Sequence, residues 1–361
     1  MTLNKAYAFA RVYQSLNLSA TLKSVAEDFV VEEFIPVEFS GEGEHCWLYI
    51  EKRDCNTDWV AQQLASYCGV KKMAVSYAGL KDRHALTSQW FSVQLPGLPT
   101  PEWPAFEGRF GAETKDQAGG ASVRGLKCFR HNRKLQRGAL KSNKFKITLR
   151  GLSDTSDAAH ALLAQRCQII AQQGVPNYFG SQRFGRDRNN LDAAAKLFTH
   201  PRYRLPKHKR SIYLSAARSW LFNCILSERI KQNVWNKGLP GDVFMLAGKS
   251  ACFKDDGSSD INTRLEENEI HPTAPLWGDG EAMVLSEAAA LESRIIEQFP
   301  VYRDGLVAAR VQAQRRACRL IPAQLEYLPA GDDCMVAFAL PAGCYATEVL
   351  AEIFSELIVP G

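Results

Sequence analysis

Alternating apolar and polar residues predict β-strands in the first and last parts of the chain. Between residues 143 and 150 the alternation is unbroken, so Phe145, Ile147 and Leu149 would share one face of a strand and Lys144 and Lys146 the other. Shorter stretches that alternate, or that are apolar and bounded by polar residues, predict further strands at 24–34, 46–51, 73–77, 89–95 and 334–340. Strands are thus expected towards both ends of the chain.

Apolar residues spaced by three or four positions predict helices between and after these strands. The first helix begins at Asn56 or Thr57, which would cap it, and carries Val60, Leu64 and Tyr67 on one face. Each of the others is predicted from residues expected to be buried: Leu162, Leu163, Ile169 and Ile170 in 157–173; Leu214, Ala217, Leu221 and Cys224 in the middle of the chain; Ala288, Leu291 and Ile295 after Ser286; and Val349, Ile353 and Leu357 near the C-terminus.

The order of these elements indicates one domain inserted into another. Gly174, Val175 and Pro176 end the helix at 157–173, and the segment 177–185 that follows is aromatic and basic rather than periodic. The strand at 334–340, a Pro-Ala-Gly turn and the closing helix would dock into the sheet formed by the earlier strands. The middle of the chain would then interrupt a single domain, which a length of 361 residues allows.

The composition is that of a globular protein without a membrane segment. Hydrophobic residues make up 46% of the chain and charged residues 23%, enough to bury a sizeable core. No apolar run reaches the roughly 18 residues that span a bilayer, and the N-terminus lacks the apolar core of a secretory signal. We therefore expect a soluble, cytoplasmic protein with no membrane partner.

The ten cysteines and seven histidines are dispersed along the chain. They form no Cys-x-x-Cys or His-Glu-x-x-His pattern, and the chain contains no EF-hand loop or phosphate-binding glycine loop. We expect reduced thiols, no metal and no cofactor. A heptad repeat is also missing, so no protein partner is implied and a monomer is expected.

Positive charge is concentrated in two segments. Residues 124–150 contain ten Lys and Arg and no acidic residue, and residues 183–218 contain ten more against Asp187 and Asp192. Together these segments have a net charge of +18, whereas the whole chain is only +5. Basic stretches that are segregated and interleaved with aromatic residues suit a phosphate backbone better than an ordinary mixed surface does. This pattern favours a nucleic acid as the partner.

The candidate catalytic residue lies in a polar connection between the strands predicted at 73–77 and 89–95. The sequence there is Ala78-Gly79-Leu80-Lys81-Asp82-Arg83-His84-Ala85-Leu86-Thr87-Ser88-Gln89. Basic residues surround Asp82, and neighbouring cations favour an ionised carboxylate, which can attack as a nucleophile or accept a proton. Taken alone, the same residues could form a solvated turn with a surface ion pair.

This string resembles the Ala-Gly-x-Lys-Asp-x-x-Ala-x-Thr-x-Gln signature of the TruD family of tRNA pseudouridine synthases, in which the Asp is catalytic. Every fixed position of the signature is present. Similarity to the family continues in order along the chain, at 26–32, 55–57, 137–143, 174–185, 214–218 and 340–343. The sequence is therefore identified as that of a member of this family.

The resemblance implies an α+β fold, in which a pseudouridine synthase catalytic domain is interrupted by an inserted α/β TRUD domain. The catalytic domain, with a mixed, largely antiparallel sheet flanked by helices, would comprise 1–173 and 319–361, and the TRUD domain 174–318. The implied substrate is uridine 13 of tRNA, and the implied catalytic carboxylate is Asp82, without metal or cofactor. Residues that match positions around the target uracil, or beside the catalytic Asp, are Phe29, Lys81, Asn143 and Tyr345.

Other interpretations of these residues stay open at this point. Phe29 could be a core residue of its strand, Asn143 a turn residue and Tyr345 a cover for the C-terminal helix. A non-catalytic RNA-binding protein would share the basic segments but would not need Asp82. A metal-dependent nuclease would need clustered carboxylates, for which Glu27, Asp28, Glu32 and Glu33 are candidates, although strand spacing divides them between two faces.

Overall fold

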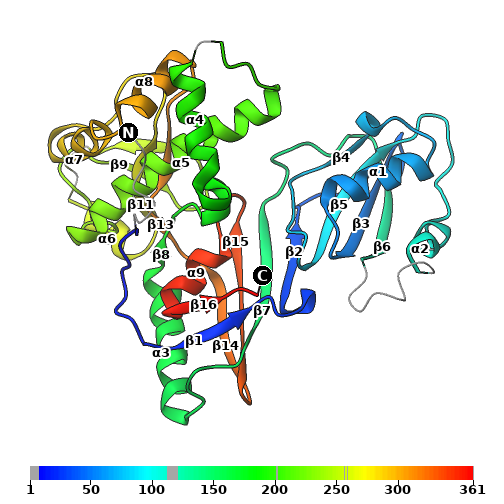
Figure 1. Cartoon of the computed structure of the whole chain (residues 1–361), viewed down its shortest axis with the longest axis horizontal. Coiled ribbons are helices and arrows are strands. Elements are labelled where there is room, and N and C mark those ends of the chain that lie inside the picture. The colour runs from blue at the N-terminus through cyan, green and yellow to red at the C-terminus, as the bar shows by residue number, and fades with distance from the viewer. Residues whose placement is uncertain (1–7, 112–120, 201, 256, 258, 361) are drawn as a thin grey trace. The chain divides into compact units, whose positions relative to one another are not determined.

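The computed structural model describes residues 8–111, 121–200, 202–255, 257 and 259–360, with only the backbone of 108–111. These residues fold into two compact units. Unit 1 comprises the described residues up to Ser15, Gln172–Ile321 and Cys344–Glu352; unit 2 comprises Leu16–Ala171, Pro322–Gly343 and the described residues from Ile353 onward. Figure 1 shows the elements of both. No helix in this part of the chain is long and apolar enough to cross a membrane.

Unit 2 is built on a ten-stranded mixed sheet. Its main path runs β14-β15-β7-β2-β5-β3-β6, with β4 beside β5, β1 beside β7 and β16 beside β1. Only the β2–β5 and β1–β16 pairs are parallel, which confirms the predicted mixed and largely antiparallel sheet. The strands are β1 (Ser19–Leu22), β2 (Phe29–Phe34), β3 (His45–Arg53), β4 (Val75–Tyr77), β5 (Leu86–Gln94), β6 (Ser122–His131), β7 (Ser142–Arg150), β14 (Ala323–Ala330), β15 (Asp333–Pro341) and β16 (Glu356–Ile358).

The strand with the cleanest alternation, β7, lies inside this sheet. It pairs with β2 on one side and β15 on the other, with Phe145 opposite Val31 and Phe338. As predicted, Ile147 and Leu149 are buried while the residues between and around them are more exposed.

Helices α1 (Thr57–Tyr67) and α2 (Trp103–Gly111) share one apolar cluster with β3 and β5, to which α1 contributes Val60 and Leu64, and α2 packs against β6. Two short 3-10 helices, η1 (Ala26–Asp28) and η2 (Lys72–Ala74), precede β2 and β4. The predicted helix at 157–173 is α3 (Asp157–Gln173). The prediction was wrong for Leu162, which is 46% exposed, because successive helical residues point about 100° apart and Leu163 already faces the core.

The end of the chain corrects another prediction. Helix α9 (Ala346–Ile353) ends before Leu357, which lies instead in β16. Backbone hydrogen bonding to the start of the chain replaces the helix here: the Ser355 N–H donates to the Leu18 carbonyl at 2.9 Å, and β16 then pairs with β1. Such a partner, distant in sequence, overrides a local helical pattern.

In unit 1 the helix α5 (Lys207–Lys231) is packed against α4 (Asn189–Thr199), α7 (Ser286–Ile296) and α8 (Pro300–Ala308). The four residues of its predicted stripe are buried, and so are Trp220, Phe222 and Ile225, so the second half of α5 is enclosed. Its first turn is exposed and basic. The α7 stripe is buried as predicted.

The strands of unit 1 were mostly not predicted, because most of them are short and several lie in a part of the chain that is rich in Gly, Pro and Asp. They form a four-stranded sheet of order β10-β9-β11-β12 and a separate β8–β13 pair. Two short 3-10 helices, η3 (Ser181–Phe184) and η4 (Arg186–Arg188), precede α4. The remaining elements are β8 (Val175–Pro176), β9 (Val243–Leu246), β10 (Cys252–Lys254), α6 (Ile261–Glu266), β11 (Ile270–Leu276), β12 (Gln314–Ala317) and β13 (Arg319–Leu320).

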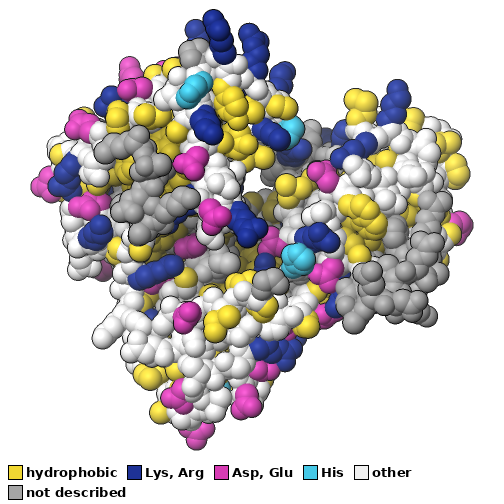
Figure 2. Space-filling model, in the orientation of Figure 1, with side chains coloured by type: hydrophobic (Ala, Val, Ile, Leu, Met, Phe, Trp, Pro, Cys, Tyr) yellow, Lys and Arg dark blue, Asp and Glu magenta, His cyan; other side chains and the backbone are white. Residues whose placement is uncertain are grey.

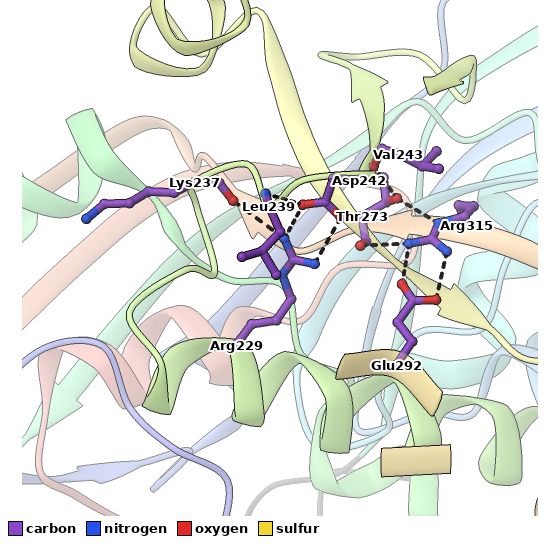
Figure 3. A network of polar contacts seen from close by, with 8 residues as sticks. All are labelled: Arg229, Lys237, Leu239, Asp242, Val243, Thr273, Glu292 and Arg315. Carbon is purple, nitrogen blue, oxygen red and sulfur yellow. Dashed lines mark hydrogen bonds and ion pairs between the residues drawn. The ribbon is translucent and has the colours of Figure 1, made fainter. Parts of the chain in front are cut away.

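Buried ion pairs join α5 and α7 to this sheet (Figure 3). Arg229 of α5 donates to both carboxylate oxygens of Asp242, and neither side chain is exposed. Arg315 of β12 binds Glu292 of α7 and also donates to the Thr273 carbonyl at 2.9 Å. The Arg229–Asp242 pair is thus fully buried, and the Arg315–Glu292 pair nearly so.

Candidate active site

Asp82 lies in the connection between β4 and β5, as the sequence predicted. The strand that follows, β5, is an interior strand with β3 on one side and β2 on the other. The Asp82 side chain is 35% exposed, so its carboxylate is accessible at the surface of unit 2.

Buried side chains bind the backbone of this loop. The Thr57 hydroxyl accepts a hydrogen bond from the Lys81 N–H at 3.0 Å and donates to the side-chain oxygen of Gln89 at 2.8 Å. The Gln89 amide in turn donates to the Gly79 carbonyl at 3.1 Å. Asn56 occupies the N-cap position of α1, one of the two residues predicted for it, but its side chain makes no capping hydrogen bond, and Thr57 binds the loop instead.

The Asp82 carboxylate is ion-paired with Lys23, whose Nζ lies 2.8 Å from the Asp82 Oδ2. Lys23 follows β1 in a left-handed backbone conformation, with φ of 62°. Its ammonium also lies 4.1 Å from the centroid of the Phe29 ring, a cation–π contact. Sequence reasoning missed Lys23, because it is 59 positions from Asp82 and nothing in its local sequence marks it.

Two basic neighbours of Asp82 in the motif contact other carboxylates instead. Lys81 Nζ binds Glu33 Oε1 at 3.0 Å, and both side chains are buried. Glu33 Oε2 also accepts the Trp90 N–H at 2.7 Å, so this pair ties the loop to β2 and β5. His84 Nδ1 lies 3.5 Å from Asp54 Oδ1. The expectation that cations of the loop itself surround Asp82 therefore needs correction.

Phe29 and Asn143 lie in the same unit as Asp82. Phe29 is 4% exposed and packs edge-on against Phe145, with 6.1 Å between ring centroids. Asn143, at the start of β7, stands opposite Glu33 in the register of the sheet. Its Oδ1 is buried and accepts no hydrogen bond within the described part of the chain. A buried acceptor without a donor is costly, so a donor that reached this atom would bind it favourably.

Tyr345, the fifth candidate residue, belongs to unit 1. Its hydroxyl accepts a hydrogen bond from Arg183 Nε at 2.8 Å, and its ring lies 6.0 Å from that of Phe179. Gly180 allows this packing, since a Cβ there would stand 2.9 Å from the Tyr345 ring. Tyr345 is therefore part of an aromatic and basic cluster at residues 179–183.

Three of the four acidic residues considered for a metal site are engaged in ion pairs. Glu27 binds Arg53, Asp28 binds Arg150 and Glu33 binds Lys81. Across the described ranges, no three His, Cys, Asp or Glu side chains are grouped so that they could hold a metal ion.

Comparison with known proteins gives one consistent result. The family model described as tRNA pseudouridine synthase D (TruD) matches residues 9–204 and 193–353. The tRNA pseudouridine synthase D of Methylococcus capsulatus is 45% identical over 345 residues, which are 95% of this chain and 93% of that protein. That of Hydrogenovibrio crunogenus is 41% identical and covers 96% of each chain.

A crystal structure described as tRNA pseudouridine synthase D from Methanosarcina mazei has the same fold. It matches with a TM-score of 0.70 over 96% of both chains, at 22% sequence identity. Because the family model and the relatives named above match nearly its whole length, this chain belongs to the tRNA pseudouridine synthase D (TruD) family.

Proposed function

We propose that this chain isomerises uridine 13 of tRNA to pseudouridine and that Asp82 is the catalytic carboxylate. Membership of the family supports the broader activity, that of a tRNA pseudouridine synthase, which is an isomerase. The position of the uridine and the identity of the acting residue are the proposal. The observation that carries it is an accessible carboxylate, ion-paired with Lys23, on a loop whose backbone is bound by buried side chains.

The reaction conserves all atoms of the nucleotide. The C1′–N1 glycosidic bond breaks, the uracil turns, and a C1′–C5 bond forms while C5 loses a proton and N1 gains one. Asp82 would act as a nucleophile at C1′ or at C6, or as the base that removes a proton from the sugar. For each role the Lys23 ammonium compensates the negative charge of the carboxylate.

The substrate-binding residues of the proposal are Phe29, Lys81, Asn143 and Tyr345. The Asn143 Oδ1 would accept a hydrogen bond from the N3–H of a uracil, because this oxygen receives no hydrogen bond from the described part of the protein. Phe29 would act through Lys23, which it contacts. A uracil taken out of its stack loses a few kcal/mol, and planar groups such as Tyr345 and Arg183 can return about 1 to 3 kcal/mol per base by stacking.

The proposal assigns the RNA contacts to the two basic segments, 124–150 and 183–218. It assigns catalysis to residues 1–173 and 319–361, and the grip on RNA outside the reacting stem to the TRUD domain at 174–318. The exposed basic side chains around the start of α5 support this role: they are Arg202, Arg204, Lys207, Lys209 and Arg210. Figure 2 shows Lys and Arg gathered there, at the top of the view near α4 and α5.

The test is to map pseudouridine in an unmodified tRNA transcript after incubation with wild type and with Asp82→Asn. Carbodiimide mapping and mass spectrometry would be used, in EDTA and without cofactors. Wild type should produce pseudouridine at position 13, whereas Asp82→Asn should produce none while binding tRNA equally well. Asp304→Asn, which changes an exposed aspartate of α8, is the matched control and should be fully active.

Each other outcome removes one part of the proposal. Pseudouridine at another position would refute the choice of uridine 13, and an active Asp82→Asn protein would refute the role of Asp82. Tight tRNA binding without pseudouridine would favour the alternative, a non-catalytic RNA-binding protein. Activity that is lost only in EDTA would indicate a metal-dependent reaction.

A further inference from the structure

Lys52, near the end of β3, is buried with 0% of its surface exposed. Lysine is among the residues that are seldom fully buried. It continues the buried alternation of Leu48 and Ile50, a position where a hydrophobic residue would be expected. Packing alone therefore does not explain a lysine at this position.

The Lys52 ammonium binds two loops at once. Nζ donates to the Cys55 carbonyl at 2.7 Å, in the connection from β3 to α1. It also donates to the main-chain carbonyl of Asp82 at 2.8 Å, in the connection from β4 to β5. Both bonds are charge-assisted and therefore stronger than bonds between neutral groups.

We propose that Lys52 is a positioning residue for Asp82, with its buried ammonium fixing the main chain of the residue that carries the carboxylate. The inference rests on the proposed function of Asp82. Thr57 and Gln89 bind the neighbouring backbone at Lys81 and Gly79, but Lys52 binds Asp82 itself. Asp82 is thus held by Lys52 at its main chain and by Lys23 at its side chain.

The protonation of Lys52 makes this anchor sensitive to pH. Burial is the main cause that lowers the pKa of Lys52, to about 8, and Lys81 acts in the same direction. Asp54, Cys55 and Asp82 oppose the change. The residues opposite Lys52 on β5 and β6 are Thr87 and Val123, neither of which titrates in this range. Above pH 8 a neutral amine would donate the weaker hydrogen bonds.

The same shift predicts how stability responds. Because the folded-state pKa lies below that of an unfolded lysine, the buried charge weakens folding below pH 8, and this loss disappears as pH rises towards 10.5. Replacing Lys52 by methionine removes the buried charge, but it also leaves the Cys55 and Asp82 carbonyls without their donor. These two changes oppose each other in the free energy of unfolding, so the test of the anchor is made on reaction rates and on amide exchange.

The first experiment compares single-turnover pseudouridine formation by wild type, Lys52→Met and Lys249→Met between pH 6.5 and 9.5. Lys249 is an exposed lysine of unit 1 and is the control for the loss of one charge. Lys52→Met should be slower at pH 7 on the order of 100-fold, as for a misplaced catalytic group, with an unchanged Kd for tRNA. The wild-type rate should decline above about pH 8, and the variant should show no such decline. A Lys52→Met rate within twofold of wild type, or the same decline in the variant, would overturn the inference.

A second readout does not depend on activity. Amide hydrogen exchange of residues 79–84, without RNA, should be faster in Lys52→Met than in wild type and Lys249→Met. In wild type, exchange of these amides should also be faster above pH 8 than at pH 7, after correction for the intrinsic exchange rates. This second comparison needs no variant, so the test remains valid if Lys52→Met does not fold. If the exchange rates of residues 79–84 are unchanged, Lys52 does not fix the main chain of Asp82, whatever the activity of the variant. If wild type forms no pseudouridine, the proposed function is refuted, and the exchange rates still decide whether Lys52 fixes the loop.

Discussion

At the scale of single residues, Asp82 is held by lysines that its own motif does not contain. Lys23 binds its carboxylate, whereas Lys81, its neighbour in sequence, binds Glu33. The residue for the chemistry could be predicted because the motif is local. Its partners Lys52 and Lys23 could not be predicted, because they lie in β3 and in the segment after β1. They are brought to Asp82 only when the sheet forms.

The Lys23–Asp82 contact gives a direct prediction for activity. Lys23→Met should slow pseudouridine formation roughly 30-fold, since a hydrogen bond to a charged group contributes about 2 kcal/mol. Single-turnover rates on tRNA would measure this effect. Lys23→Arg keeps the charge and should retain most of the rate; equal rates for Lys23→Met and wild type would show that the ion pair does not assist the reaction.

His271 in β11 gives a prediction for the pH dependence of stability. It is buried, its Nδ1 accepts a hydrogen bond from Arg319 Nε at 3.0 Å, and burial followed by the Arg319 charge lowers its pKa to about 4. Between pH 6.5 and 4 this histidine is protonated in the unfolded chain but largely neutral in the folded chain. The free energy of unfolding should therefore fall as the pH is lowered through this range. The side-chain oxygen of His271→Asn can accept the same bond without titrating.

Urea unfolding of wild type and His271→Asn at several pH values between 4 and 7 would measure this. The loss of stability on acidification should be smaller in the variant, by at most about 3 kcal/mol for a shift of this size. Parallel pH profiles for the two proteins would contradict the assignment.

At the scale of elements, the helices and strands that were predicted wrongly are those whose conformation depends on contacts distant in sequence. The helices α3 and α7 and the strand β7 were predicted because their periodicity alone selects one buried face. The strand β16 was mistaken for helix because only its pairing with β1 makes it extended. The sheet of unit 1 was largely missed because most of its strands are short. Contacts between strands distant in sequence also stabilise it, such as the bond from Arg315 of β12 to the Thr273 carbonyl of β11.

The buried Arg229–Asp242 pair between α5 and the start of β9 predicts a large effect on stability. Asp242→Asn leaves the Arg229 charge buried without a countercharge, which should lower the free energy of unfolding by about 3 to 5 kcal/mol. The exposed Arg303–Asp304 pair provides the control, and Asp304→Asn should change the free energy of unfolding very little, because solvent screens exposed charges. Urea denaturation would compare them; equal effects would show that burial does not govern these pairs.

At the scale of the whole molecule, the uneven distribution of charge predicts how RNA binding depends on salt. Reversing Lys207, Lys209 and Arg210 to Glu should raise the Kd for tRNA at least about tenfold and reduce the slope of log Kd against log salt by about 2 to 3. Filter binding or fluorescence anisotropy across a salt series would measure both quantities.

The control for this experiment reverses Lys231, Lys249 and Lys254, three exposed or partly exposed lysines of unit 1 outside the basic segments. Both triple variants have the same net charge, so a difference between them reports position rather than total charge. If the two variants bind alike at every salt concentration, the segment 183–218 has no specific part in gripping RNA.

The discontinuous make-up of the two units has a consequence for synthesis on the ribosome. Unit 1 includes Cys344–Glu352, whose Val349 and Leu350 are buried, and unit 2 includes β16, which pairs with β1 from the other end of the chain. Domains that are continuous in sequence can fold one after another as they emerge. Here neither unit has all of its parts until the segment from Cys344 to β16 has been made, so neither unit can complete its folding before that segment emerges from the ribosome.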